Sequence, residues 1–200
     1  MPHSTRLLFF AGSAREGSLN KKLARLAHDV AEANGIAATL ADLGDYPMPI
    51  YDGDIEARDG PPENAWKLKA LMNVHHGVFI AAPEYNASVT PLLKNAVDWV
   101  SRTRSDDEPQ LMVYRTRVFA LGSASPGAFG GMRGLLAMRQ VLEVGLNALV
   151  LPDQIAIMRA SDAFGDDGHL KDKSQMELLR AVVQKLARAA HVMRGENDKA

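Results

Sequence analysis

Five short, mostly apolar runs separated by segments with helical spacing constrain the fold of this chain more than any other feature. The runs are Leu7–Ala11, Ile36–Leu40, Gly77–Ala82, Arg117–Leu121 and Ala148–Leu151. A strand that is covered on both faces lacks the polar alternation of a half-exposed strand, and such strands are typical of parallel sheets. We therefore predict five buried parallel strands.

The segments between these runs repeat apolar residues every three to four positions, as amphipathic helices do. They predict helices over residues 18–34, 62–74, 91–100, 130–144 and 173–193. Alternating strands and helices imply right-handed crossovers and a doubly wound α/β sheet with helices on both faces. Ligands of such folds bind beyond the carboxyl ends of the strands. Residues 1–200 are expected to form a single domain with a frayed, disordered tail at 195–200.

Composition excludes several function classes. Lys and Arg number 23 against 24 Asp and Glu, so the overall charge favours neither nucleic acid nor a membrane surface as a partner. No apolar stretch approaches the roughly 18 residues of a membrane span, and no secretory signal is recognisable, so we expect a cytoplasmic protein. The absence of Cys excludes disulfides, thiolate metal sites and a cysteine nucleophile. The six His residues lack the H-E-x-x-H spacing, and we assign no metal.

Two segments match no regular element. Residues 42–61 are rich in Pro, Gly and Asp and predict a long loop, which either covers the carboxyl edge of the sheet or merely connects two elements. Residues 101–116 mix three Arg with three acidic residues and predict a solvated loop.

The segment Gly12–Asn20, between the first strand and the first helix, combines hydrogen-bonding side chains with one permanent cation. Ser13, Ser18 and Asn20 offer hydrogen bonds, and Arg15 offers a forked positive charge. A helix N-terminus adds unpaired amides and a positive dipole, so the segment suits a phosphate. The alternative is a turn followed by an ordinary Ser N-cap. The segment matches neither the P-loop nor the G-x-G-x-x-G pattern.

Two further loops are expected at the same edge. After the third strand, Pro83–Pro91 carries Tyr85, and we expect the backbone amides of residues 85–88 to be free for the polar edge of a flat ring that Tyr85 covers. Thr90 and Pro91 read as a helix N-cap and first helical position. After the fourth strand, residues 122–131 form a small-residue loop, whose Gly130 and Gly131 allow either close approach of a ligand or tight helix packing.

The chain resembles the NAD(P)H-dependent FMN reductases of flavodoxin-like fold, which include quinone, chromate and azo-dye reductases. The shared motifs are G-S-x-R-x-x-S-x-N at 12–20, P-E-Y-N at 83–86, S-x-x-P-L-x-K-N-A-[VI]-D-W at 88–99 and S-x-G-x-x-G-G at 125–131. They occur in the same order and cover most of the chain.

The resemblance implies one bound FMN, with its phosphate at 13–20 and the remainder along the other two loops. It implies these cofactor-binding residues: Ser13, Arg15, Ser18, Leu19, Asn20, Pro83, Glu84, Tyr85, Asn86, Ser88, Ser123, Ser125, Gly127, Gly130 and Gly131. No side chain is required as a general acid or base, because the flavin carries the chemistry.

The implied activity is a ping-pong transfer of hydride from NAD(P)H, with NADPH slightly favoured, to FMN and then to a small electron acceptor. Flavin, quinone, azo compound and metal oxyanion all remain possible acceptors. The family also implies a homodimer or homotetramer with the active site near a subunit interface. The competing hypothesis is a flavodoxin-type electron carrier, against which the Arg-bearing phosphate loop argues.

Overall fold

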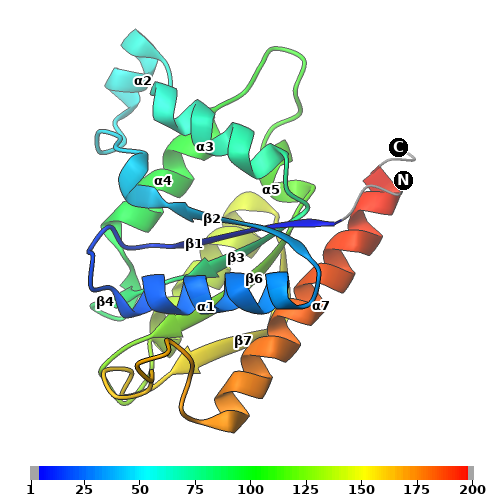
Figure 1. The fold of residues 1–200 in the computed structure, drawn as a ribbon. Coiled ribbons are helices and arrows are strands. Elements are labelled where there is room, and N and C mark those ends of the chain that lie inside the picture. Colours follow the sequence, from blue (N-terminus) through cyan, green and yellow to red (C-terminus); the bar gives the residue numbers. More distant parts are fainter. Residues whose placement is uncertain (1–4, 198–200) are drawn as a thin grey trace.

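The computed structural model describes residues 5–197, which form one five-stranded parallel sheet in the order β2-β1-β3-β6-β7 (Figure 1). Its strands are β1 (Arg6–Ala11), β2 (Ala37–Asp42), β3 (Gly77–Ala81), β6 (Val118–Ala124) and β7 (Leu149–Ile157). The order reverses between β1 and β3, so their carboxyl ends flank the crevice where doubly wound folds bind ligands. The predicted sheet is confirmed.

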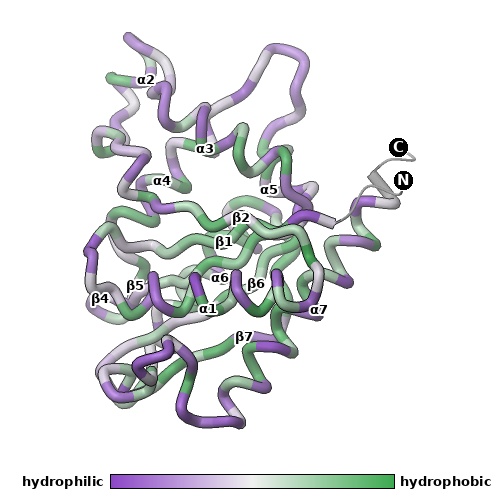
Figure 2. Tube along the Cα trace, in the orientation of Figure 1, coloured by the Kyte–Doolittle hydropathy of each residue, from purple (hydrophilic) through white to green (hydrophobic). Residues whose placement is uncertain are grey.

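Helices cover both faces of the sheet. The helices α1 (Leu19–Ala33) and α7 (Lys173–Asn197) cover one face, and α3 (Glu63–Asn73), α4 (Pro91–Arg102) and α6 (Met132–Gln140) cover the other. Along β1, Leu7 and Phe9 belong to one apolar cluster, and Leu8 and Phe10 to the other. Figure 2 shows the central strands as mostly hydrophobic, as expected of strands buried on both faces.

β7 is longer than the strand predicted over Ala148–Leu151, and it contains Pro152, which lacks an amide hydrogen. The strand continues to Ile157, with a register shift opposite Phe119 and Leu121 that bulges the residues around Pro152. This is tolerated because β7 lies at the edge of the sheet, where a proline need not donate to a neighbour. The helix predicted over 130–144 begins as α6 and ends as one π-helical turn, Val141–Gly145.

Both segments predicted as loops contain short helices. Residues 42–61 include a 3₁₀ turn, Leu43–Asp45, and α2 (Gly53–Asp59). Residues 101–116 include α5 (Met112–Arg115), whose Tyr114 is buried and donates from its hydroxyl to the Val97 carbonyl at 3.1 Å. Glu108 of the same segment forms an ion pair with the buried Lys69. The prediction of a solvated loop at 101–116 is therefore confirmed for residues 104–107 and 109–110, which are exposed. It is wrong for the two ends, since 101–102 belong to α4 and 112–115 form α5, whose buried residues anchor the segment together with the ion pair.

Helix α7 extends beyond the predicted end at Met193 and includes the first residues of the segment predicted as a disordered tail. Residues 198–200 of that tail lie outside the described residues. Among residues 5–197, no helix combines the length and the apolar character that a membrane crossing requires.

Candidate functional site

Three loops meet at the carboxyl edge of the sheet: loop 1 (residues 12–18), loop 2 (residues 82–90) and loop 3 (residues 125–131). They enclose a cavity of about 100 Å³. Its lining residues are Ser13, Arg15, Ser18, Leu19, Asn20, Pro83, Glu84, Tyr85, Ala124, Ser125 and Pro126. Most of the predicted cofactor-binding residues thus line one cavity, while Asn86, Ser88, Ser123, Gly127, Gly130 and Gly131 lie outside its lining.

Loop 1 has the features of an anion site. Ser18 is the N-cap of α1 and accepts a hydrogen bond from the Lys21 amide, so its hydroxyl hydrogen is left to donate into the cavity. Ser13 accepts from the Arg15 amide in the same way, at 3.3 Å. The Arg15 side chain is exposed and forms no ion pair with a carboxylate within residues 5–197. Two hydroxyls, one guanidinium and the α1 N-terminus therefore converge on the cavity.

Asn20 joins two elements at the edge of the cavity. Its side chain is buried, its Nδ2 donates to the Ala124 carbonyl at 2.9 Å, and its Oδ1 accepts from the Ala124 amide at 3.0 Å. The amide oxygen and one amide hydrogen are therefore used to join α1 to the end of β6. Asn20 also lines the cavity, and its contact with the phosphate stays a prediction.

Loop 2 is more ordered than the predicted open loop. Its residues form a hairpin of β4 (Glu84–Tyr85) and β5 (Ser88–Val89), in which Tyr85 pairs with Ser88. The central residues Asn86 and Ala87 have φ of 51° and 64°, as in a type I′ turn. Only these two amides lie outside the strand pairing, so the prediction of four free amides is wrong. Tyr85 lines the cavity and is 56% exposed.

Glu84 points toward α6. Its carboxylate accepts from Arg133 Nε at 2.8 Å and from the Gly134 amide at 3.0 Å, and its side chain is only 8% exposed. Burial works to raise the pKa of Glu84, but the hydrogen bonds from Arg133 and Gly134 outweigh it and hold the pKa below its usual value. Arg133 in turn lies 4.9 Å from the centre of the Phe129 ring. The carboxylate therefore joins loop 2 to α6 instead of binding in the cavity.

Loop 3 contributes through Ser125, whereas its glycines serve packing. Gly130 and Gly131 have φ of 59° and 87°. A Cβ on Gly131 would lie 1.9 Å from Ser123 Oγ, and one on Gly130 would lie 2.9 Å from the Ile157 backbone. Of the two roles considered for these glycines, close packing of loop 3 on β6 and β7 is the one found. Ser123 is fully buried beneath Gly131, with no hydrogen-bond partner for its hydroxyl among the described residues.

Two residues outside the predicted cofactor-binding set also shape loop 1. Thr90 is the N-cap of α4, as predicted, but its hydroxyl also donates to the Gly12 carbonyl at 2.7 Å. Lys21 pairs with Asp42 at the end of β2 and donates to the Ala14 carbonyl at 3.0 Å. The sequence marked the Thr90 cap, but neither long-range bond leaves a local signal in the sequence.

A larger hollow of about 480 Å³ lies on the other side of loop 1, between α1 and β2. Its lining mixes both charge signs: Lys21 is paired with Asp42, and Lys22, Arg25, Glu16 and Asp45 also belong to the lining. These charges offset one another, and loops 2 and 3 contribute no residue to the lining. We therefore assign ligand binding to the smaller cavity, where all three loops meet.

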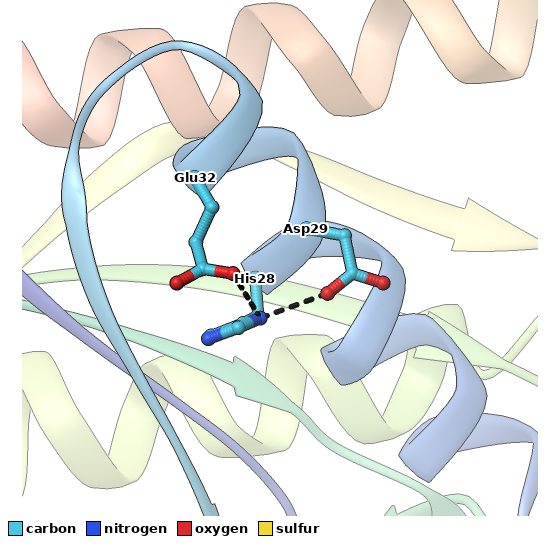
Figure 3. A group of neighbouring side chains, drawn as sticks. All are labelled: His28, Asp29 and Glu32. Atoms are coloured by element: carbon cyan, nitrogen blue, oxygen red, sulfur yellow. Dashed lines mark hydrogen bonds and ion pairs between the residues drawn. The ribbon is translucent and has the colours of Figure 1, made fainter.

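Within residues 5–197, one group of side chains lies close enough to share a metal ion: His28, Asp29 and Glu32 on α1. Figure 3 shows the His28 ring with dashed contacts to both carboxylates, at 2.9 Å from Asp29 and 3.9 Å from Glu32. The ring also packs edge-on against Phe9. Neighbours on one helix turn account for these contacts, and we assign no metal to the group.

Comparison with known proteins gives consistent results. The family described as NADPH-dependent FMN reductase matches residues 5–162. A quinone reductase of Pseudomonas putida is 35% identical over 178 residues, covering 88% of this chain and 89% of the relative. An NAD(P)H-dependent FMN reductase of Pseudomonas aeruginosa is 30% identical over 196 residues, covering 98% of this chain and all of the relative.

Among solved structures, the flavoenzyme NAD(P)H:(acceptor) oxidoreductase of Paracoccus denitrificans superposes with a TM-score of 0.78 at 23% identity. The superposition covers 94% of this chain and 98% of that one. At this identity the likeness concerns the fold.

Proposed function

Because this chain belongs to the NADPH-dependent FMN reductase family, we propose that it transfers electrons from NAD(P)H to a small acceptor, preferably a quinone, at the cavity between loops 1, 2 and 3. The observation that carries the proposal is the convergence of two hydroxyls, the Arg15 guanidinium and the exposed Tyr85 ring on one cavity. Family membership also favours an enzyme over an electron carrier.

The residues present fit an FMN. Arg15, Ser13 and Ser18 would hold the phosphate, because a phosphate dianion needs a cation and several donors, and this cation has no carboxylate partner among the described residues. The turn amides of Asn86 and Ala87 and the ring of Tyr85 would contact the rest of the cofactor. When bound, FMN supplies the centre that accepts and releases the hydride.

The protein contributes binding and orientation. The cavity encloses a volume suited to a phosphate, whereas Tyr85 lies at its exposed side, which leaves room for a planar substrate at the surface. We infer that the nicotinamide ring and the acceptor bind there in turn, each excluding the other. In total, NAD(P)H and one proton reduce a quinone to its hydroquinone, and NAD(P)⁺ is released before the quinone binds.

Steady-state kinetics with the FMN-loaded protein tests this proposal. We expect NADPH-dependent reduction of a benzoquinone, with parallel double-reciprocal lines when both substrates are varied. A protein that takes up no FMN would exclude the function, and intersecting lines would exclude the ping-pong order alone. The same assay should be run with NADH in place of NADPH, and with free flavin, an azo dye and chromate in place of the quinone. The values of kcat/KM then rank the reductants and the acceptors. The homo-oligomeric state and the cytoplasmic location stay predictions.

A further inference from the structure

We propose that Asn20, Thr90 and Glu84 are positioning residues that tie the three loops into a closed ring, so that the FMN groove is formed before the cofactor binds. The inference rests on the proposed function, because flavins serve as its probes. Asn, Thr and Glu side chains can bind ligands, but the polar atoms of these three residues bond to backbone groups of other segments.

The three connections close a circuit. Thr90 of loop 2 donates to the Gly12 carbonyl of loop 1 at 2.7 Å. Asn20, at the start of α1, forms two bonds with Ala124, the residue before loop 3. Glu84 of loop 2 accepts from the Gly134 amide and from Arg133, both just after loop 3. Loops 1 and 2 are therefore joined directly, and each is joined to an element that borders loop 3: β6 through Asn20 and α6 through Glu84.

Each connection is shielded from water. Asn20 and Thr90 are 5% and 3% exposed, and the Glu84 side chain is 8% exposed. A backbone group that loses its partner in such a place stays unsatisfied, so the bonded arrangement is strongly preferred over alternatives. Close packing adds to this preference, since a Cβ on Gly12 would lie 2.8 Å from the Leu93 side chain and one on Gly134 would lie 3.0 Å from Glu84 Cβ.

A ring of this kind has a consequence for binding. A preformed groove lowers the ordering cost of the ligand complex, and it does so for every ligand that uses the groove, whether or not the ligand carries a phosphate. A residue that contacts the phosphate affects only ligands that have one. FMN and riboflavin, which differ by the phosphate alone, therefore separate the two roles.

The test measures dissociation constants of FMN and riboflavin for the full chain and its variants by flavin fluorescence. We expect Asn20→Ala, Thr90→Val and Glu84→Gln to raise the dissociation constants of both FMN and riboflavin by about tenfold or more. The preference for FMN over riboflavin, given by the ratio of the two constants, should stay within about twofold of the wild-type value. In Arg15→Ala this preference should disappear, because only FMN binding is weakened. Thr90→Ser keeps the hydroxyl and should restore both affinities.

Leu186→Ala provides the matched control. Leu186 is buried and packs near Gly77 at the amino end of β3, the edge of the sheet opposite the three loops. It should lower the free energy of unfolding without changing flavin affinity or the visible circular dichroism of the bound flavin at saturation. The ring variants should change that spectrum.

Three results would overturn the inference. If Asn20→Ala loses the preference for FMN over riboflavin, Asn20 is a phosphate ligand. If the three variants bind both flavins as the wild type does, the ring does not contribute to flavin binding. If Leu186→Ala weakens flavin binding as much as the ring variants do, the effect comes from the lower stability of the whole protein. Glu84→Gln keeps the side-chain shape and an acceptor for Gly134, so it tests the ring even if Asn20→Ala does not fold. A wild-type protein that binds neither flavin would instead refute the proposed function.

Discussion

Replacement of Arg15 by alanine removes the one cation that loop 1 contributes to the lining of the cavity. Its guanidinium forms no ion pair with a carboxylate within residues 5–197, so the substitution leaves no buried charge without a partner. Ser13 and Ser18 remain, together with the N-terminus of α1. The loss should therefore be confined to anion binding, and the free energy of unfolding of the protein without flavin should hardly change.

The expected magnitude follows from the exposure of Arg15. A hydrogen bond to a charged group contributes about 1.5–3 kcal/mol, and solvent around an exposed guanidinium keeps the value in the lower part of that range. About 1.5–2 kcal/mol corresponds to a rise of roughly 10- to 30-fold in the dissociation constant of FMN. Riboflavin, which lacks the phosphate, should bind equally well to both proteins. Arg15→Lys keeps the charge but loses the fork and should fall between them.

Fluorescence titration at several pH values provides the assay. The second pKa of a phosphate monoester is about 6, so the dianion is converted to a monoanion as the pH falls from about 7.5 to about 5. The difference in FMN affinity between the wild type and Arg15→Ala should shrink over that interval, and added salt should shrink it at pH 7.5. Equal loss of riboflavin affinity, or a difference that grows at low pH, would refute the phosphate assignment.

Three further predictions concern stability. Gly131→Ala should lower the free energy of unfolding in urea by about 2–4 kcal/mol, because Gly131 has a φ of 87° and an added Cβ would lie 1.9 Å from Ser123 Oγ. If the changes in the free energy of unfolding caused by Gly131→Ala and Ser123→Gly are additive in the double variant, this contact is not the cause. Ala87→Gly relieves a φ of 64° in the type I′ turn and should raise stability by about 0.5–1 kcal/mol, so a lower melting temperature would contradict it. Burial, helped by Arg6 and Arg117, lowers the pKa of His75. The unfolded state thus binds more protons than the folded state just below about pH 6.5. As the pH is lowered through this range, the free energy of unfolding should decrease more steeply in the wild type than in His75→Gln. Equal dependence on pH in the two proteins would contradict this prediction.

The sequence by itself determined the alternation of strands and helices, because continuous apolar runs fit only strands buried on both faces. It also located the three loops at the carboxyl edge, since parallel strands place their carboxyl ends together. Local signals sufficed for the Ser18 and Thr90 caps, which depend on residues within one helix turn. These features need no knowledge of distant contacts.

Only the tertiary structure decided what the polar side chains at that edge do. Asn20 and Glu84 have the residue types of ligands, yet their partners lie 104 and about 50 positions away along the chain. A hydrogen bond between distant segments leaves no periodicity or spacing in the sequence, and the same holds for the packing of Gly131 on Ser123. The sequence could therefore place these residues at the edge where the three loops meet, while the fold showed that Asn20, Thr90 and Glu84 bond to other elements and that Arg15 has no carboxylate partner among the described residues.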